Sequence, residues 1–470
     1  MRDGRLTWKG LYRESDLYKA AVRLYTKPLF NGRKALATST DERTLYDFAR
    51  KGLQNLHRLH RQLSHREFEF RPCLAVPRNF NGKHRTLYIF PWEERLVSLL
   101  LYRRLSQALD AKFSNNSYAY RQRGFGVDCC QRRIAAQLRR QRRPLFVMKR
   151  DITRFFDSID HGVLLDKLRD FVEPDDYLYD LLSSCVDFDY ELAGRVRTAE
   201  VGVPFGSAVA CLFANLYLMR LDERLADLPG FTFFRYADDL LGLSESSEVL
   251  ERAATVFDDE LADLKLRSKL SHHENFQLLH TGEPQAALPV QSRFRHLGLE
   301  FRSDGSIGLA RDKFRKLRNL FRFAFRRKKS RIDRAQVPEK RARAAIDIAQ
   351  ETIADGVRNV ALIDYYLRHV NDEAQLKRLD RWLAEEVLSL AFGGGHKKSY
   401  FRRLPYSRLR EMGLPSLVHR RRLIVHGHLE SPFFIWQSER LRRRNGGTAV
   451  RPKTNSAFSQ SPEAATNASS

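Results

Sequence analysis

Two neighbouring carboxylates occupy a short turn of this sequence, in the tetrapeptide Tyr236-Ala-Asp-Asp239. Apolar runs flank the turn, Phe231-Thr-Phe-Phe234 before it and Leu240-Leu-Gly-Leu243 after it. A strand, a tight acidic turn and a second strand predict a β-hairpin with Asp238 and Asp239 at its tip. Because adjacent carboxylates repel each other, a divalent cation is the usual reason to hold them together, and Mg²⁺ prefers carboxylate oxygen. The alternative is an ordinary solvated turn, since paired aspartates are common on protein surfaces.

A third carboxylate, Asp151, follows the apolar segment Pro144-Leu-Phe-Val-Met148. That segment predicts a short strand, and Asp151 would lie near its end. The chain between Asp151 and Asp238 is long enough to form helices and return to a neighbouring strand. Two adjacent strands would then hold three carboxylates around a pair of divalent ions, about 3.5–4 Å apart, the arrangement used for phosphoryl transfer. A structural role is the alternative for an aspartate at a strand end.

The elements that must position these carboxylates belong to a long and strongly basic chain. Its 470 residues contain 83 Lys and Arg against 57 Asp and Glu, a formal net charge of +26, and 43% are hydrophobic. Such a charge indicates a polyanionic partner, most simply nucleic acid. An anionic membrane surface is the rival partner, but no apolar run approaches the roughly 20 residues that span a bilayer. We therefore expect no membrane partner.

The cysteines and the N-terminus bear on the compartment. None of the five cysteines forms a Cys-x-x-Cys pair, and their odd number does not indicate a disulfide framework. The first residues lack the apolar core of a signal peptide. We therefore expect a cytoplasmic protein.

Several ordered motifs together resemble those of reverse transcriptases, especially bacterial enzymes related to group II introns. The segment Asp151–His161 resembles their motif A, Gly202–Leu218 motif B and Tyr236–Asp239 motif C. Upstream, the segments that resemble the fingers motifs are Lys83–Ile89, Glu94–Val97 and Phe113–Arg121, and downstream the primer-grip motif is matched by Phe294–Leu299. The order and spacing agree over roughly residues 70–305.

The resemblance implies an α+β fold, the right-hand polymerase fold with fingers and palm. Four regions are expected. Residues 1–65 form a helical basic extension, and residues 66–302 form the fingers and palm. Residues 303–444 form a helical, thumb-like RNA-binding region, and residues 445–470, rich in small polar residues, form a disordered tail. One hairpin is expected over residues 294–309, turning at Ser303-Asp-Gly-Ser306.

The family's catalytic roles map onto three aspartates. The resemblance implies that Asp151, Asp238 and Asp239 are catalytic and that they bind two Mg²⁺ ions, with Mn²⁺ as a substitute. The backbone carbonyl of Ile152 is implied as a further metal ligand.

The resemblance also implies binding residues. Lys83 and Arg85 would grip the triphosphate, Arg121 would lie near the nucleotide or template, and a solvated surface role is the alternative for Arg121. Phe156 would collide with a ribose 2′-OH and favour deoxynucleotides, with a core aromatic as the alternative. The template and primer would be contacted by Gly206, Ser207, Leu297 and Gly298.

Two departures from the family pattern stand out. Motif B usually has Gln between Pro and Gly, whereas this chain has Phe205 there. The family's motif D often contains a lysine that protonates pyrophosphate, and no lysine stands at the matching place. The general acid is therefore left open among Lys265, Lys269, His272 and His273.

The leading hypothesis is an RNA-directed DNA polymerase that adds dNTPs to a 3′ end and yields a DNA product. By resemblance to solitary bacterial reverse transcriptases, its template would be a structured noncoding RNA and its role antiphage defence. A maturase-like RNA-binding protein, a retron-type enzyme and a basic scaffold are the alternatives. The C-terminal residues Lys397, Lys398 and Arg420 to Arg422 could hold RNA phosphates, with a solvated basic loop as the alternative. The oligomeric state is left open.

Overall fold

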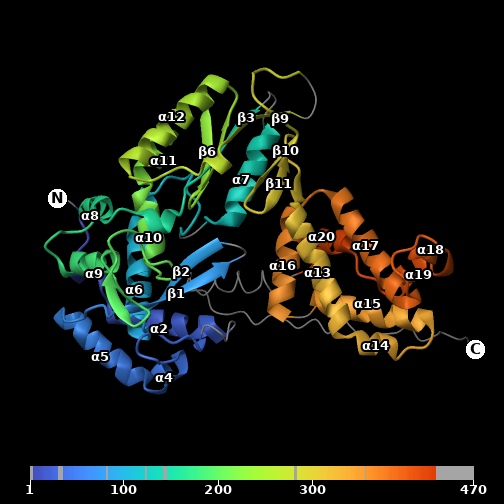
Figure 1. Cartoon of the computed structure of the whole chain (residues 1–470), viewed down its shortest axis with the longest axis horizontal. Helices are drawn as coiled ribbons and strands as arrows, with labels where there is room; N and C mark the ends of the chain where they lie inside the picture. The colour runs from blue at the N-terminus through green and yellow to red at the C-terminus, as the bar shows by residue number, and fades with distance from the viewer. Residues whose placement is uncertain are drawn as a thin grey trace, which may run out of the picture. The chain divides into compact units, whose positions relative to one another are not determined.

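The computed structural model describes residues 4–29, 35–80, 83–121, 124–140, 145–279, 283–354 and 356–429, with backbone alone at 26–29, 80, 83–84 and 356–362. The chain divides into two compact units, residues 1–306 and residues 307–470 (Figure 1). The predicted boundaries at residues 65 and 445 stay predictions, and the predicted tail at 445–470 lies outside the described residues.

The first unit begins with short helices that pack onto a long buried one. These helices are α1 (Trp8–Leu11), α2 (Glu14–Leu29), α4 (Leu45–Arg50) and α5 (Gly52–His65), and the long helix is α6 (Trp92–Leu109). The indole of Trp8 donates to the carbonyl of Leu63 at 3.1 Å. Leu17, Leu59 and Leu100 belong to one hydrophobic core that extends into the rest of the unit. The N-terminal helices therefore share their core with α6.

A four-stranded sheet follows, in the order β2-β1-β4-β5. Its strands are β1 (Cys73–Phe80), β2 (Lys83–Ile89), β4 (Asp189–Leu192) and β5 (Arg195–Thr198). β1 and β2 pair antiparallel, with Leu74 opposite Ile89. Elements that connect this sheet to the next are η1 (Asp110–Lys112), α7 (Val127–Arg140), η2 (Phe155–Ser158), α8 (His161–Arg169), α9 (Tyr177–Val186) and α10 (Ala210–Tyr217).

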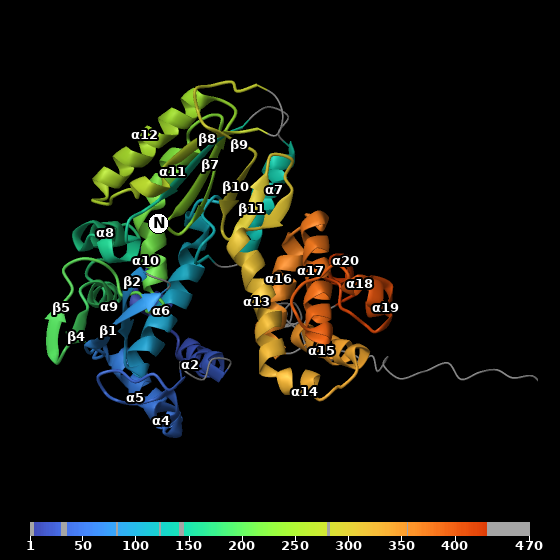
Figure 2. The ribbon, with the colours of Figure 1, turned by 45° about the vertical axis from the view of Figure 1, so that its right-hand side comes forward.

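The central sheet has the order β6-β7-β3-β8-β9 and carries the carboxylates. Its strands are β3 (Leu145–Asp151), β6 (Phe231–Tyr236), β7 (Asp239–Ser244), β8 (Glu274–Leu278) and β9 (Val290–Gln291). β3 pairs antiparallel with both β7 and β8, and Asp151 stands opposite Asp239. Helices α11 (Met219–Ala226) and α12 (Ser247–Asp263) pack on this sheet (Figure 2). The apolar runs thus become largely buried strands.

The turn predicted at Ser303–Ser306 is present, and an additional turn precedes it within residues 294–309. β10 (Arg293–His296) pairs antiparallel with β11 (Leu299–Arg302) around Leu297-Gly298. Both turn residues have positive φ, 48° at Leu297 and 81° at Gly298. Leucine is unusual in this conformation, so sequence alone gave no reason to place the turn there. In the predicted turn at residues 303–306, Gly305 has φ 73°.

The second unit begins with one short strand and otherwise consists of helices in the part of the chain that the structure describes. They are α13 (Arg311–Arg327), α14 (Lys329–Asp333), α15 (Pro338–Ala354), α16 (Gly356–His369), α17 (Glu373–Phe392), α18 (Tyr400–Arg403), α19 (Tyr406–Glu411) and α20 (Leu417–Val425). The Gln375 side chain of α17 bonds both the N–H and the carbonyl of Leu309 in β12 (Ile307–Leu309). The mixture of sheets in one unit and helices in both confirms the predicted α+β class. Within the described ranges, no helix is long and apolar enough to cross a membrane.

Candidate active site

The hairpin tip between β6 and β7 has a strained backbone. Only Ala237 and Asp238 connect the two strands, and Ala237 has φ 59°, a conformation in which hairpin turns usually use glycine. The guanidinium of Arg235 donates to the carbonyl of Ala237 at 3.0 Å. This bond helps to hold the alanine in a conformation that costs an L-residue roughly 1–2 kcal/mol.

Arg235 is itself fixed by a buried ion pair. Its guanidinium donates to Asp222 Oδ1 at 2.6 Å and to Ser117 Oγ at 2.8 Å, and both members of the pair are about 1% exposed. A buried charge is tolerated only where it is paired and hydrogen-bonded. Neither Arg235 nor Asp222 was singled out from the sequence, although a charged residue inside the apolar run before Tyr236 was an available signal.

Asp151 and Asp238 meet in one cavity of about 360 Å³. Asp151 ends the central strand β3, and Asp238 projects from the tip of the neighbouring hairpin. The other lining residues come from β2, from the segment after β3 and from the loops before α7, α10 and β8: Arg85, Thr86, Tyr120, Ile152, Thr153, Arg154, Phe155, Phe156, Asp157, Phe205 and Lys269. The structure therefore brings together five predicted residues, namely Asp151, Asp238, Ile152, Phe156 and Arg85.

The two carboxylates in the cavity repel each other. Burial raises the pKa of Asp238 to about 6, and the nearby Asp151 carboxylate adds to the effect. Such a pair gains stability from a bound cation, and two carboxylates beside a backbone carbonyl form the oxygen-rich donor set that Mg²⁺ prefers. The residues present therefore fit a divalent metal.

Asp239 lies differently from the other two carboxylates. It is not among the cavity's lining residues, and its Oδ1 lies 3.4 Å from Nδ1 of the buried His296. Burial is the largest single effect and would raise the pKa of Asp239, but the nearby His296, Lys149 and His272 together hold that pKa below its usual value. Within the described ranges, no group of three or more His, Cys, Asp and Glu side chains is arranged to hold a metal ion.

Aromatic rings form one wall of the cavity. The ring of Phe156 makes edge contacts with Phe205 at 5.6 Å and with Tyr120 at 6.1 Å. The guanidinium of the exposed Arg85 lies 5.5 Å from the centre of the Phe205 ring. Phe205 thus occupies the position where the sequence departs from the family pattern, and it packs against Phe156. The side chain of Lys83 lies outside the described residues.

Arg121 is used within the protein rather than at the cavity. Its side chain is 2% exposed and pairs with Asp110 at 2.9 Å. It also donates to the carbonyls of Ser114 and Ser117, and it lies 4.0 Å from the centre of the Phe125 ring. The structure does not bring Arg121 to the carboxylates.

The loop before α10 is fixed by Gly206 and Ser207. Gly206 has φ 125°, and a Cβ there would stand 2.9 Å from the carbonyl oxygen of Tyr88. The Ser207 hydroxyl bonds the hydroxyl of Ser98 at 2.6 Å, and Ser98 also accepts the N–H groups of residues 208 and 209. Ser207 thus ties this loop to α6, and Gly206 lets the loop backbone approach β2 closely.

Leu297 and Gly298 form the turn between β10 and β11, apart from the cavity lining. The carbonyl of Leu297 accepts a hydrogen bond from the Gln131 side chain of α7 at 3.0 Å. Neither residue is brought to Asp151 or Asp238.

The four proton-donor candidates separate clearly. Lys269 Nζ lies 3.6 Å and His272 Nδ1 3.2 Å from the same oxygen of Asp151. By contrast, Lys265 pairs with Asp160 at 2.7 Å, and His273 contacts Ser268. The N–H of Lys269 also donates to the carbonyl of Asp151 at 2.8 Å, so the backbone fixes this arrangement.

Comparison with known proteins agrees with this geometry. Residues 76–301 match the family model described as reverse transcriptase (RNA-dependent DNA polymerase). The chain carries a reverse transcriptase domain. The match begins in β1 and ends in β11, so it contains all three aspartates, Phe156 and Arg85.

Two curated proteins resemble parts of this chain. Protein YkfC of Escherichia coli is 26% identical over 152 residues, which cover 32% of this chain and 39% of that protein. The putative COX1/OXI3 intron 2 protein of Saccharomyces cerevisiae is 25% identical over 175 residues, 36% of this chain and 20% of that protein. The chain thus spans well under half the length of these relatives.

Solved structures resemble it more distantly. A telomerase from Candida albicans, solved with a fragment of telomeric RNA, covers 79% of this chain and 71% of its own at 10% identity, with a TM-score of 0.43. The partial Cas6-RT-Cas1–Cas2 complex contains a chain that is 21% identical, covering 55% of this chain and 42% of its own, with a TM-score of 0.33.

Proposed function

We propose that this protein is an RNA-directed DNA polymerase that adds dNTPs to a 3′ end. The observation that carries the proposal is the cavity in which Asp151 and Asp238, from neighbouring strands, lie with Arg85 and Phe156 inside the region that matches reverse transcriptases. The carboxylates would bind the metal ions that accompany a triphosphate, and the cation would neutralise phosphate charge. The aromatic ring would contact the sugar.

Asp151, Asp238 and the carbonyl of Ile152 would hold two Mg²⁺ ions, and Mn²⁺ would substitute. Asp239 is proposed as a further carboxylate of the set, since it stands opposite Asp151 on β7. When bound, the ions would activate the primer hydroxyl and stabilise the leaving pyrophosphate. The protein's own contribution is to hold the carboxylates, through the strand pairing and the Arg235 brace, before the metal arrives.

The remaining residues of the cavity would orient the nucleotide. Arg85 is exposed beside the cavity and would neutralise triphosphate charge, together with Lys83 of the same strand. Phe156, packed against Phe205, would exclude a ribose 2′-OH. We assign the proton transfer to pyrophosphate to Lys269, which lines the cavity. Arg121, Gly206, Ser207, Leu297 and Gly298 would support the site by fixing its backbone.

A primer-extension assay on an RNA template with dNTPs and Mg²⁺ tests this proposal. Asp238→Ala should lose at least about 10²-fold in rate, because a preorganised charge at the reacting group is removed. Asp166→Ala, at a carboxylate that is 72% exposed on α8, should match wild type. Equal extension by Asp238→Ala and wild type would refute the polymerase assignment. Phe156→Val should raise ribonucleotide incorporation relative to dNTPs.

We also propose that the template is a structured noncoding RNA and that the role is antiphage defence. The support is the motif pattern, in particular Phe205 in place of the usual Gln, which resembles solitary bacterial reverse transcriptases. Sequencing the nucleic acid that co-purifies with the protein identifies the template. Phage challenge of cells carrying wild type or Asp238→Ala tests the role, and equal protection by both would contradict it.

A maturase-like role is the second candidate, favoured by the likeness to an intron protein and by the net charge of +26. It predicts that RNA splicing by wild type and by Asp238→Ala is equal. Loss of extension without loss of splicing would separate the two functions in one protein.

A further inference from the structure

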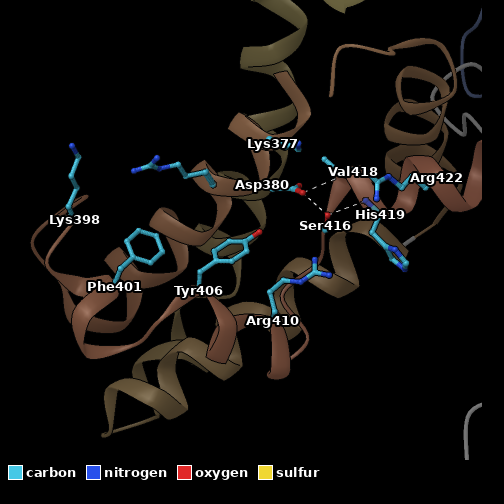
Figure 3. Close-up of a pocket in the computed structure, with 11 residues that line it drawn as sticks. Lys377, Asp380, Lys398, Phe401, Tyr406, Arg410, Ser416, Val418, His419 and Arg422 are labelled. Atoms are coloured by element: carbon cyan, nitrogen blue, oxygen red, sulfur yellow. Dashed lines mark hydrogen bonds between the residues drawn. The ribbon is translucent and has the colours of Figure 1, made fainter. Parts of the chain in front are cut away.

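The second unit contains an open pocket of about 790 Å³ that the polymerase proposal does not use. Four helices and their connections form it: α17, α18, α19 and α20. The side chains that line it are shown in Figure 3, and they are Lys377, Asp380, Arg381, Lys398, Phe401, Tyr406, Arg410, Ser416, Val418, His419 and Arg422. Five of these are permanent cations and only one is a carboxylate.

Among the described residues, two of the cations form no close ion pair. In that part of the chain, no carboxylate lies within ion-pair distance of Lys398 or Arg410, and both are exposed, although the charge of Arg410 acts against the burial that raises the pKa of Asp380. Arg381 and Arg422 pair with Glu385 and Glu373 at 3.2 Å, but these pairs are exposed and therefore weak. The cations at the rim of the pocket are therefore available to bind phosphate groups.

The one carboxylate is committed to the fold. Asp380 is 6% exposed, and it accepts the hydroxyl of Ser416 at 2.6 Å and the N–H of Leu417 at 2.7 Å, which fixes the start of α20. Burial raises the pKa of Asp380. A phosphate placed directly beside this carboxylate would be repelled. The inner part of the pocket therefore favours a neutral group, and the rim favours an anion.

Aromatic rings stand where that neutral group would lie. Tyr406 is 38% exposed, and Figure 3 shows its ring beside that of Phe401, with its hydroxyl end towards Asp380 and Ser416. Exposed rings beside cations are the combination that proteins use for unpaired nucleotides, since any base offers a face for stacking. A duplex would offer phosphates but no free base face.

We propose that this pocket binds an unpaired nucleotide within a single-stranded segment of nucleic acid. Its base stacks against Tyr406 and Phe401, and the flanking phosphates contact Lys398, Arg410 and Arg422. Arg420 and Arg421, next in the sequence, are excluded because Arg420 pairs with the buried Asp364 at 2.7 Å and Arg421 donates to the carbonyl of Val370. This inference goes beyond the polymerase proposal, and it does not depend on catalysis.

Binding is measured by fluorescence anisotropy of a labelled RNA strand of about eight nucleotides, in EDTA, with the full chain carrying Asp238→Ala. Tyr406→Ala should weaken binding at least about fivefold, because base stacking is lost. Tyr406→Phe should keep it. The matched control is Tyr46→Ala, a tyrosine with similar exposure, 45%, in the first unit. Equal loss in both alanine variants would overturn the proposal.

A charge-matched pair of variants separates the pocket from general attraction. Lys398→Glu with Arg410→Glu should weaken binding more than Arg334→Glu with Lys340→Glu, exposed cations of the same unit outside the pocket. Photocrosslinking with 4-thiouridine RNA should place the adduct on Tyr406 or Phe401. Equal effects of the two charge pairs, or a free nucleotide competing as well as the strand, would overturn binding of a single strand.

Discussion

The two pockets of this protein are built in opposite ways. The cavity at Asp151 and Asp238 is about 360 Å³, and its carboxylates are fixed by strand pairing and by a buried arginine. The pocket of the second unit is about 790 Å³, and its cations are exposed side chains on three helices and a loop. Bond-making chemistry requires atoms at fixed positions, whereas retention of a flexible polyanion requires charge and ring surface near the right place.

The two pockets also differ in which groups form the hydrogen bonds around them. Around the first cavity, Arg235 and Ser98 each bind several groups and fix a turn or a loop. Around the second, Asp380 is the buried polar group that fixes the local fold, and most of the cations remain at the solvent. We therefore expect substitutions near the first cavity to change folding or rate, and substitutions in the second pocket to change affinity.

The largest expected effect is on the brace of the first cavity. Asp222→Ala leaves the Arg235 guanidinium buried without its carboxylate, and it should lower the free energy of unfolding by about 3–5 kcal/mol. Urea denaturation monitored by circular dichroism measures the change. The exposed Asp166→Ala should stay within about 0.5 kcal/mol of wild type. A loss below about 1 kcal/mol in Asp222→Ala would mean that the brace is unimportant.

Next in size is the effect of the cavity lysine on catalysis. Lys269→Ala should reduce the single-turnover rate of dNTP incorporation about 10²-fold, as expected for loss of a proton donor, and flatten the alkaline limb of its pH profile. The control is Lys265→Ala, because Lys265 pairs with Asp160 outside the cavity. Similar rates for the two variants would remove Lys269 from the mechanism and turn attention to His272.

A smaller effect follows from the repulsion between the carboxylates. Because burial raises the pKa of Asp238 from 3.8 to about 6, the folded protein keeps a proton there that the unfolded chain releases. Stability should therefore fall as pH rises through that window, and the penalty should be complete above pH 6. Asp238→Asn should raise the melting temperature in EDTA at pH 8 but not below pH 3.8. A uniform shift at all pH values would contradict this origin.

The smallest effect is expected in the second pocket. Lys398 is exposed and unpaired, so Lys398→Ala should change the free energy of unfolding by less than about 0.5 kcal/mol. The same substitution should lower the slope of log binding constant against log salt concentration by about 0.7, if one phosphate contact is lost from a single strand. A large stability change would show that this pocket resembles the first more closely than its exposed cations suggest.

The sequence predicts the parts of the active site that depend on local pattern. The structure contains the predicted hairpin around Tyr236–Asp239 and the predicted strand before Asp151. Both could be predicted because each apolar run is bounded by turn or polar residues. Local sequence also fixes the start of α8, where Asp160 accepts the N–H of Val163 as a helix cap. These features depend on a few consecutive residues.

Contacts between distant segments could not be predicted in the same way. Lys269 lies against Asp151 because residues 267–269 pair with residues 151–153. Asp239 lies against His296 because His296 belongs to a hairpin whose turn contains a leucine. Arg121 carries a charge that suggested a ligand, but burial and three backbone carbonyls occupy it. Residue type alone does not distinguish a cation that holds the fold from one that awaits a phosphate.

Gly206 has a consequence for how this sequence can vary. Two features exclude a side chain at this position: the positive φ, and the carbonyl oxygen of Tyr88, which would lie 2.9 Å from an added Cβ. A complete library of substitutions at this position, selected for function, should therefore return glycine almost alone. Its neighbour Phe205, whose ring is half-buried at the cavity wall, should tolerate several large side chains. The two adjacent positions would thus differ sharply in mutational tolerance. Substitutions at Phe205 could change nucleotide selectivity, while Gly206 keeps the conformation of the loop unchanged.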